Sequence, residues 1–248
     1  MELLEWDARV YESLPLPHKR WGAEAIARLE LAGDETVLDL GCGTGRDAER
    51  LLEALPRGRV IAVDGSQQML EELRTRLADR TDRMQVIHAD LREPLPLNIQ
   101  VDAVLSVATL HWLPDHARVF DSVAHALRPR GRFVAEAGGE GNLTAFRRAL
   151  TAVAGDDGSA FWTFAGVEAT ADRLRAAGFV DIEVALVPDP ARFERGEQLE
   201  TFIATVLLGA QLRELPEADR RPFVAAVAER LEEPVIDYVR LQIVATRG

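Results

Sequence analysis

The sequence predicts an α/β fold in which helices cover a doubly wound, mostly parallel sheet. Short apolar segments alternate with amphipathic segments from about residue 20 to residue 137, as in parallel strands joined by crossover helices. A glycine-rich stretch, 41–45, follows the first apolar segment. Aspartates stand at the ends of the first three expected strands, at the sheet edge where such folds bind their ligands.

Each expected element of the first half has a local signal. The strands are short apolar runs that stop at glycine or charged residues, and the helices show apolar residues at helical spacing. Ser66 can cap a helix, and Pro56 ends the helix before it. The expected helices are 19–31, 46–55, 66–78 and 115–127, and the expected strands are 36–40, 60–63, 85–88, 101–107 and 132–137.

The second half is less regular. Two helices and a sixth strand are expected first, then a helical pair, then a seventh strand with alternating polarity. The helical pair lies within about 45 residues, 190–234, which are too regular for a linker. The expected helices are 143–154, 167–177, 198–213 and 217–232, and the expected strands are 180–187 and 238–246.

Composition limits the partners. The formal net charge is −12 and Lys19 is the only lysine, so we expect a small-molecule substrate and no nucleic-acid partner. No apolar run reaches the roughly 20 residues that span a bilayer, so no membrane partner is expected. Cys42 is the only cysteine, which excludes an internal disulfide and a multi-cysteine zinc site. We expect no metal, a cytoplasmic location, and a monomer or a homodimer.

The glycine-rich stretch ends the segment VLDLGCGTG, residues 37–45. Glycine allows a sharp turn and lets a ligand approach the main chain. A dinucleotide site of the GxGxxG type needs a third glycine where this chain has Arg46, and Asp39 would bring negative charge near a pyrophosphate. S-adenosylmethionine has no phosphate and carries an ammonium and a sulfonium group. An acidic loop suits it, and an NAD-linked oxidoreductase is the alternative from another class.

Two later aspartates have the placement of nucleoside partners. Asp64 follows Gly45 by 19 residues and ends the second strand, where a carboxylate can accept hydrogen bonds from a ribose. Asp90, in the segment HADLRE, can accept one from an adenine amino group, with the backbone of Leu91 beside it. Either aspartate alone could instead cap a turn or a helix. The three positions together favour a nucleoside cofactor.

These segments together resemble class I S-adenosylmethionine-dependent methyltransferases. VLDLGCGTG, VIAVDGSQQML, HADLRE and DAVLSVATLHWLPD have the order and spacing of the successive motifs of that family. Within it, the chain is similar to the trans-aconitate methyltransferases through Trp6, Asp7 and Tyr11, through 111–116 and through the closing IVATR. It is less similar to the malonyl-carrier-protein methyltransferases. His111 stands where trans-aconitate enzymes usually have glutamine, so the substrate does not transfer with the resemblance.

The resemblance implies a Rossmann-like, seven-stranded sheet in the order 3-2-1-4-5-7-6, with the last strand antiparallel. It also implies S-adenosyl-L-methionine as cofactor and S-adenosylhomocysteine as product. We expect a single domain: 1–30 form an N-terminal lid and first helix, 31–137 the cofactor-binding core, and 138–248 a C-terminal half with a helical cap at about 190–234. The expected cofactor contacts are Asp39, Gly41, Cys42, Gly43, Gly45, Asp64, Gly65, Ser66, Met69, Asp90, Leu91, Ser106 and Val107.

Methyl transfer is an in-line displacement, in which the protein mainly supplies approach geometry and a dry site. A carboxylate, with a pKa of about 4, needs no base at neutral pH, whereas a phenol, an alcohol or a carbon acid needs one. His111 follows the fourth strand and is the candidate catalytic base, since an ordinary histidine titrates at about 6.5. Alternatively, His111 and Trp112 form a wall of the pocket without proton transfer.

The lid over the acceptor is expected to come from the N-terminus, the loop after the fifth strand (136–142) and the late helical pair. We expect O-methylation of a carboxylate or a hydroxyl on a small molecule. The alternatives are C-methylation in isoprenoid, quinone or polyketide metabolism, and a cofactor-binding partner protein without catalysis. The expected substrate contacts are Tyr11, Arg20, Trp21, His111, Trp112 and Arg240.

Overall fold

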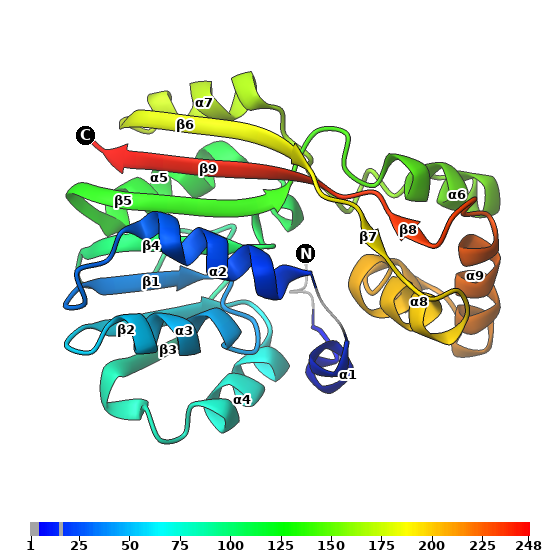
Figure 1. Cartoon of the computed structure of the whole chain (residues 1–248), viewed down its shortest axis with the longest axis horizontal. Helices are drawn as coiled ribbons and strands as arrows, with labels where there is room; N and C mark the ends of the chain where they lie inside the picture. Colours follow the sequence, from blue (N-terminus) through cyan, green and yellow to red (C-terminus); the bar gives the residue numbers. More distant parts are fainter. Residues whose placement is uncertain (1–4, 15–16) are drawn as a thin grey trace.

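The computed structural model describes residues 5–14 and 17–248. Residues 1–4 and 15–16, which belong to the expected N-terminal lid, lie outside the described residues. A large sheet with helices on both faces forms one part of the molecule, and a mostly helical part projects from one edge of it (Figure 1).

The sheet has seven strands in the order β3-β2-β1-β4-β5-β9-β6. The first five pair in parallel, and β9 is antiparallel to both β5 and β6. Since β9 is the seventh strand of this sheet along the chain, the expected order and the antiparallel last strand are confirmed. The strands are β1 (Thr36–Leu40), β2 (Arg59–Asp64), β3 (Met84–His88), β4 (Val101–Val107), β5 (Leu127–Gly138), β6 (Phe179–Pro188) and β9 (Val239–Arg247).

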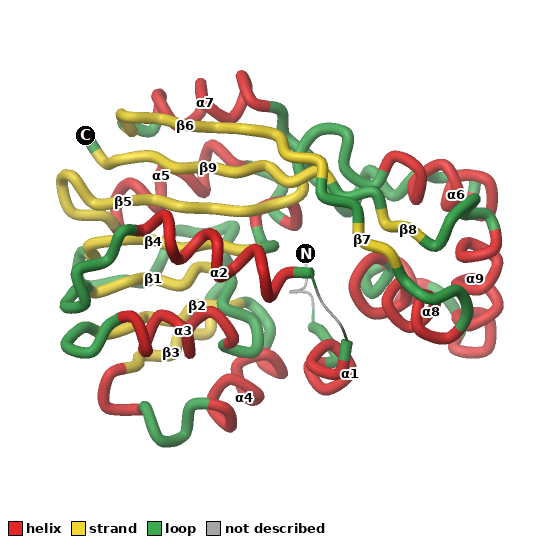
Figure 2. The backbone as a smooth tube through the Cα atoms, viewed as in Figure 1, coloured by secondary structure: helices red, strands yellow, loops and turns green. Residues whose placement is uncertain are grey.

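Two apolar layers hold the sheet between its helices. One face packs against α2 (His18–Leu29), α3 (Arg46–Ala54) and α4 (Gln67–Arg76), and the other packs against α5 (His116–Ala126) and α7 (Val167–Ala176). Figure 2 shows α2 and α3 in front of the strands and α5 and α7 behind them. Strand β1 is buried on both faces because its side chains alternate between these two layers. Each fully buried aliphatic side chain contributes about 1.5–3 kcal/mol to folding.

The helical part consists of α6 and of the chain between β6 and β9, which we call the β6–β9 connection (residues 189–238). Helix α6 packs against α9, and a short two-stranded sheet, β7 with β8, joins the connection to the large sheet (Figure 1). Helix α1 contacts α4 on one side and the connection on the other. The elements are α1 (Ala8–Ser13), α6 (Thr144–Ala154), β7 (Ala191–Arg192), α8 (Glu197–Phe202), α9 (Glu217–Glu229) and β8 (Val235–Ile236).

The single helix expected over 198–213 is wrong in its middle. Helix α8 passes into a π-helical turn, Ile203–Leu207, and then a 3₁₀ turn, Gln211–Glu214. The wider turn is visible in the hydrogen bond from N of Leu208 to O of Ile203, five residues earlier. Gly209 then interrupts the helical backbone. Apolar periodicity gives no warning of this change, because both helix types bury the same residues.

Candidate active site

A cavity of about 520 Å³ lies at the carboxyl edge of the sheet. Its wall combines the loops after the parallel strands, the N-terminal segment and the π-helical turn of the β6–β9 connection. Such a volume is ordinary for small-molecule and cofactor sites. The wall includes the expected cofactor contacts Gly41, Gly43, Asp64, Gly65, Ser66, Met69, Asp90, Leu91 and Val107. It also includes the expected substrate contacts Tyr11, Trp21, His111, Trp112 and Arg240.

The glycine loop after β1 turns sharply at this edge. Gly41 has a φ of +79°, and a Cβ on it would lie 2.1 Å from Oγ1 of Thr109, so no larger residue fits there. A Cβ on Gly43 would meet no atom within 4 Å, and Gly43 lines the cavity. The loop therefore leaves its main chain at Gly43 open to a ligand.

The carboxylate of Asp64 joins the loops that follow β1 and β2. Its Oδ2 accepts a hydrogen bond from N of Gly43, and its Oδ1 accepts one from N of Ser66, both at 2.8 Å. Burial raises the pKa of Asp64, and the backbone amides that bond to it oppose this rise. Carboxylate oxygens can each accept more than one hydrogen bond, so this group in the cavity wall suits a ribose diol.

Asp90 lies in the wall as a neutral pair with Arg92. The guanidinium of Arg92 donates from Nε to Oδ1 at 2.8 Å and from Nη2 to Oδ2 at 2.7 Å. These bonds hold the pKa of Asp90 below its usual value despite partial burial. The sequence did not indicate this partner, although it stands only two residues away. Whether Asp90 also binds adenine stays a prediction.

Asp39 lies beneath the glycine loop, outside the cavity wall. The residue is 2% exposed, and its Oδ2 has no hydrogen-bond partner within 5–14 and 17–248. Burial, with the nearby charges of Asp47 and Asp64, raises the pKa of Asp39 well above its usual value. Its expected contact with the cofactor stays a prediction, which the placement does not favour.

Three other expected contacts also lie behind the wall: Cys42, Gly45 and Ser106. Oγ of Ser106 donates to O of Leu40 at 2.9 Å and so links β4 to β1. A Cβ on Gly45 would lie 2.7 Å from Cγ of Leu73, so this glycine allows α3 and α4 to approach. Burial raises the pKa of the Cys42 thiol, which keeps it protonated. In this structure these residues support the loop from behind.

His111 lies on a 3₁₀ turn, Leu110–Trp112, that follows β4. Its Nδ1 is 3.1 Å from N of Gly138 and accepts the hydrogen bond of that amide. Because a backbone N–H can only donate, the neutral ring must carry its proton on Nε2. The ring also packs against Trp112 and Phe164, with centroid distances of 5.2 and 6.1 Å. These contacts fix both the orientation and the tautomer of His111.

Aromatic side chains line much of the cavity beyond the glycine loop. Trp6 meets Trp112 edge-on with ring centroids 5.1 Å apart, and Trp112 is 6.4 Å from Trp162. Trp21 and Tyr238 form a second edge-on pair at 5.1 Å. We call these five residues the aromatic wall. They come from segments far apart in the sequence, so only the fold brings them together.

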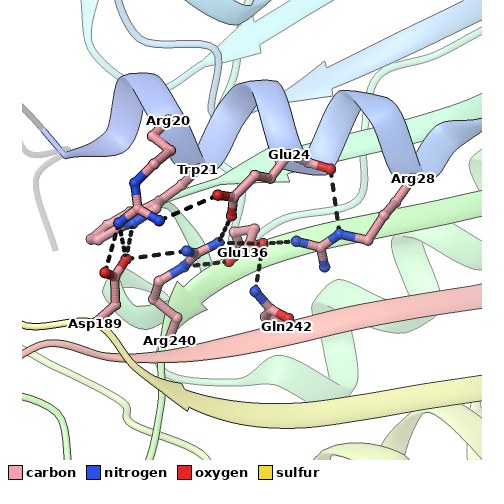
Figure 3. A network of polar contacts seen from close by, with 8 residues as sticks. All are labelled: Arg20, Trp21, Glu24, Arg28, Glu136, Asp189, Arg240 and Gln242. Atoms are coloured by element: carbon pink, nitrogen blue, oxygen red, sulfur yellow. Dashed lines mark hydrogen bonds and ion pairs between the residues drawn. The ribbon is translucent and has the colours of Figure 1, made fainter.

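Arg240, at the start of β9, is bound by three carboxylates of the chain itself (Figure 3). Its guanidinium bonds to Glu136 at 2.7 Å, to Glu24 at 2.8 Å and to Asp189 at 3.1 Å. Arg240 is 3% exposed and Glu136 is 1% exposed. Burial raises the pKa of Glu136, and the charge of Arg240 opposes this rise. Such an occupied guanidinium is a poor anchor for a substrate carboxylate.

Arg20, the other arginine among the expected substrate contacts, lies outside the cavity wall. Its Nη2 donates to both carboxylate oxygens of Asp189 at 2.6 Å, and Nε1 of Trp21 donates to the same carboxylate at 2.5 Å (Figure 3). Arg20 therefore belongs to the network that holds Asp189. Its role as a substrate contact stays a prediction that the geometry does not favour.

The N-terminal segment is fixed to the core by two glutamates. The carboxylate of Glu5 accepts hydrogen bonds from Oγ of Ser66 at 2.7 Å and from N of Gln67 at 2.9 Å, at the start of α4. Glu12 bonds to Nε of Arg46 at 2.9 Å and to Nη2 of Arg76 at 2.5 Å. Trp6 and Tyr11, between these anchors, line the cavity.

Several wall residues were not expected from the sequence. They stand in segments without a recognisable motif, apart from Thr109, which lies inside the motif around His111. Their contribution depends on how the β6–β9 connection folds back over the sheet edge. They include Thr109, Leu143, Val206, Leu207, Ala210, Arg213 and Tyr238.

Comparison with known proteins agrees with this geometry. Residues 37–131 match the family model of the methyltransferase domain, and this range holds the glycine loop, Asp64 and Asp90. Over this range the chain is similar to methyltransferase domains. This match confirms the family resemblance for residues 37–131.

Sequence relatives of this methyltransferase domain include trans-aconitate 2-methyltransferases. One from Azoarcus sp. (strain BH72) is 36% identical over 126 residues, and one from Escherichia coli (strain K12 / DH10B) is 33% identical over 127 residues. Each match covers 51% of this chain and 48% of the relative. The chain thus spans about half the length of the curated relatives it matches.

Solved methyltransferases share the fold of the whole chain. An S-adenosylmethionine-dependent methyltransferase from Mesorhizobium loti is 23% identical, covers 92% of this chain and 98% of its own, and has a TM-score of 0.58. Phosphoethanolamine N-methyltransferase 2 of Haemonchus contortus, in complex with S-adenosyl-L-methionine, is 17% identical, covers 92% of this chain and 52% of its own, and has a TM-score of 0.62. These likenesses support the fold.

Within 5–14 and 17–248, no group of three or more His, Cys, Asp and Glu side chains could hold a metal ion. Over the same ranges, no helix is long and apolar enough to cross a membrane.

Proposed function

We propose that the chain is an S-adenosylmethionine-dependent methyltransferase that O-methylates a carboxylate on a small molecule. One observation carries this proposal: the glycine loop and Asp64 share a single cavity with the aromatic wall and His111. A cofactor bound at the loop would therefore face an acceptor held by the aromatic residues, without any rearrangement of the fold. The trans-aconitate 2-methyltransferases among the relatives, whose named substrate is a carboxylic acid, support an acid as acceptor.

The residues of the wall fit this cofactor. The main chain at Gly43 is open to a ligand, and the Asp64 carboxylate has the position for a ribose diol. Leu91 offers an apolar surface for the adenine ring. Arg92, the arginine nearest in sequence to these groups, is already paired with Asp90. A pyrophosphate would lack a free cation here and would meet the carboxylate of Asp64, so NAD fits poorly. When bound, the cofactor would supply an activated methyl group on its sulfonium: the acceptor oxygen would bond to the methyl carbon as the sulfur–carbon bond breaks and its electron pair stays on sulfur.

The chain contributes position and dryness to this chemistry. The aromatic wall excludes water, and the two anchors of the N-terminal segment keep Trp6 and Tyr11 over the cavity. Holding two reactants in line contributes up to about 7–11 kcal/mol to lowering a barrier. No proton has to leave an acceptor that is already a carboxylate at neutral pH.

A transfer assay with methyl-labelled S-adenosylmethionine against acids, phenols, amines and carbon acids tests this proposal. We expect label in a methyl ester, which mild alkali hydrolyses to release labelled methanol. Transfer only to nitrogen or carbon would contradict the O-methylation. Tight binding of S-adenosylhomocysteine without transfer to any member of the panel would favour a cofactor-binding protein without catalysis.

A further inference from the structure

We propose that the acceptor is an acid with an apolar body and a single carboxylate, and not a polycarboxylate such as trans-aconitate. This inference rests on the proposed function and narrows its substrate class. It follows from three properties of the cavity: which charges in the wall are already paired, which surfaces remain, and which groups could remove a proton.

Two of the three arginines in the described wall are paired with carboxylates of the chain itself. The described part of the wall contains three arginines, Arg92, Arg213 and Arg240, and no lysine. Arg92 is bound side-on by Asp90, and Arg240 is bound by three carboxylates and almost fully buried. A substrate carboxylate would have to displace one of these partners and leave it without a cation, which is unfavourable in a buried site.

Arg213 does not provide a strong binding partner for a substrate carboxylate. It forms no ion pair within the part of the chain that the structure describes, but its side chain is exposed, and the exposed Glu214 follows it directly in the wall. A surface cation beside a carboxylate attracts an anion only weakly. Both residues belong to the 3₁₀ turn of the β6–β9 connection, so they are not part of the aromatic wall.

The remaining surface is apolar. The aromatic wall is continued by Val206, Leu207 and Ala210 of the connection, and by Phe161 from the loop between α6 and α7. Three edge-on or tilted ring contacts, of 5.1 to 6.4 Å, hold the rings of the wall in place. A flat or branched hydrocarbon body can fill such a surface, whereas a second carboxylate there would lose its hydration without a compensating partner.

Within the described wall, no group beside the aromatic residues is placed to deprotonate an acceptor; the carboxylate of Glu214 is exposed on the 3₁₀ turn of the connection. Burial raises the pKa of Tyr11 and of Tyr238, so both phenols stay protonated. Asp90 is paired with Arg92, and Asp64 is bonded to backbone amides at the end where the cofactor binds. His111 accepts a hydrogen bond at Nδ1 and carries its proton on Nε2. A nucleophile that is already ionised is therefore required, and a carboxylate is one.

One carboxylate has a counter-charge in this site, since the bound cofactor brings a sulfonium. Methyl transfer to a carboxylate forms an ester, uses a lone pair of the carboxylate oxygen, and neither consumes nor releases a proton. A second or third carboxylate on the acceptor would have no such partner. The charges of the site thus favour binding of a monoacid over a polyacid. This substrate preference distinguishes the chain from the relatives that are trans-aconitate 2-methyltransferases.

The test compares an arylalkanoic monoacid, the dicarboxylic acid of the same carbon skeleton, and trans-aconitate, with S-adenosylmethionine in the full chain. We expect kcat/KM for the monoacid to exceed that for either polyacid by at least about tenfold. Binding to the complex with sinefungin, an unreactive analogue that carries a cationic amine where the cofactor has its sulfonium, should show the same order by calorimetry without any turnover. A preference for trans-aconitate or for the diacid in both measurements would overturn the inference while leaving the proposed function intact; no transfer to any acid would contradict both.

A pair of variants tests the reason for the preference. Ala210→Lys adds a cation to the apolar part of the wall, and Ala210→Leu adds bulk without charge. The ratio of kcat/KM for the diacid to that for the monoacid should rise about tenfold in Ala210→Lys and stay near its original value in Ala210→Leu. An equal change in both variants would show that shape, and not charge, sets the preference.

Discussion

Asp64 is the residue on which the proposed cofactor site depends most. It lies in the wall of the cavity and fixes the open glycine loop through the amide of Gly43. The raised pKa of Asp64 reflects burial, so an added hydrogen-bond donor such as a ribose hydroxyl would relieve a group that is costly to bury. Measuring both the cofactor affinity and the thermal stability of a variant separates the role of Asp64 in binding from its role in holding the loop.

Asp64→Ala should weaken the binding of S-adenosylhomocysteine by about 10- to 100-fold. The variant loses charge-assisted hydrogen bonds, each of which contributes about 1.5–3 kcal/mol. Titration calorimetry measures the affinity, and a melting curve without ligand shows how much the loop itself loses. Asp121→Asn, on the exposed surface of α5, is the matched control and should bind like the original chain. An unchanged affinity in Asp64→Ala would place the cofactor elsewhere.

His111→Gln should retain transfer to a carboxylic acid within about tenfold of the original rate. A glutamine amide offers both an acceptor for N of Gly138 and a donor, whereas it cannot act as a base. The variant should keep the pH profile of the original chain between about pH 6 and 8, because the proposed reaction moves no proton. A loss of more than 10³-fold, with cofactor affinity intact and a rate that follows a histidine titration, would establish His111 as a base.

At the scale of elements, the N-terminal segment closes the cavity through glutamates that bind α3 and α4. Burial works against the charge of Glu12, but hydrogen bonds from Thr44 and Arg46 prevail and hold the pKa of Glu12 below its usual 4.5. A lowered pKa means that this contact stabilises the fold at pH values above about 4.5. The contribution is then lost as pH falls through the lower value of the folded state.

Glu12→Gln should lower the free energy of unfolding by about 1–3 kcal/mol at pH 7, since it removes the carboxylate that pairs with both Arg46 and Arg76. The difference from the original chain should shrink below about pH 4.5, where Glu12 itself becomes protonated. Urea unfolding at steps from pH 7 to pH 3 measures this difference. A difference that grows on acidification would contradict the assigned direction of the pKa shift.

The strands could be predicted from the sequence because the buried strands are continuous apolar runs next to glycine or aspartate, whereas their order came from the resemblance to methyltransferases. Segment 37–45 predicted both β1 and the turn at Gly41. The pairing of Asp90 with Arg92, and the bonds of Glu12, involve side chains whose direction no periodicity indicates. The π-helical turn was missed because apolar spacing of three and four residues does not distinguish it from an α-helix.

At the scale of the whole molecule, one network of ion pairs joins α2 to the two places where the chain passes between the large sheet and the β6–β9 connection. Asp189 follows β6 as the chain leaves the sheet, and Arg240 stands at the start of β9 as the chain returns. Arg20, Glu24 and Arg28 of α2 bond to this network (Figure 3). The position of the connection over the cavity therefore depends on charges that lie away from the cofactor loop.

Arg240→Met should destabilise the fold by about 3–5 kcal/mol, because it leaves the buried Glu136 and its neighbours without their main cation. Adding Glu136→Met in the same chain should recover part of this loss, since an apolar pair in place of a buried ion pair costs little. Arg192→Met removes an exposed ion pair with Glu233 in the connection and should cost no more than about 1 kcal/mol. Equal losses in Arg240→Met and Arg192→Met would contradict the assigned role of the network.

The central claim is that the cavity at the sheet edge binds S-adenosylmethionine and not a dinucleotide. Titration calorimetry of the full chain with S-adenosylhomocysteine, and separately with NAD, tests it most directly. The structure predicts saturable binding of one S-adenosylhomocysteine per chain and no heat of binding with NAD under the same conditions. Saturable binding of NAD with no response to S-adenosylhomocysteine would contradict the claim.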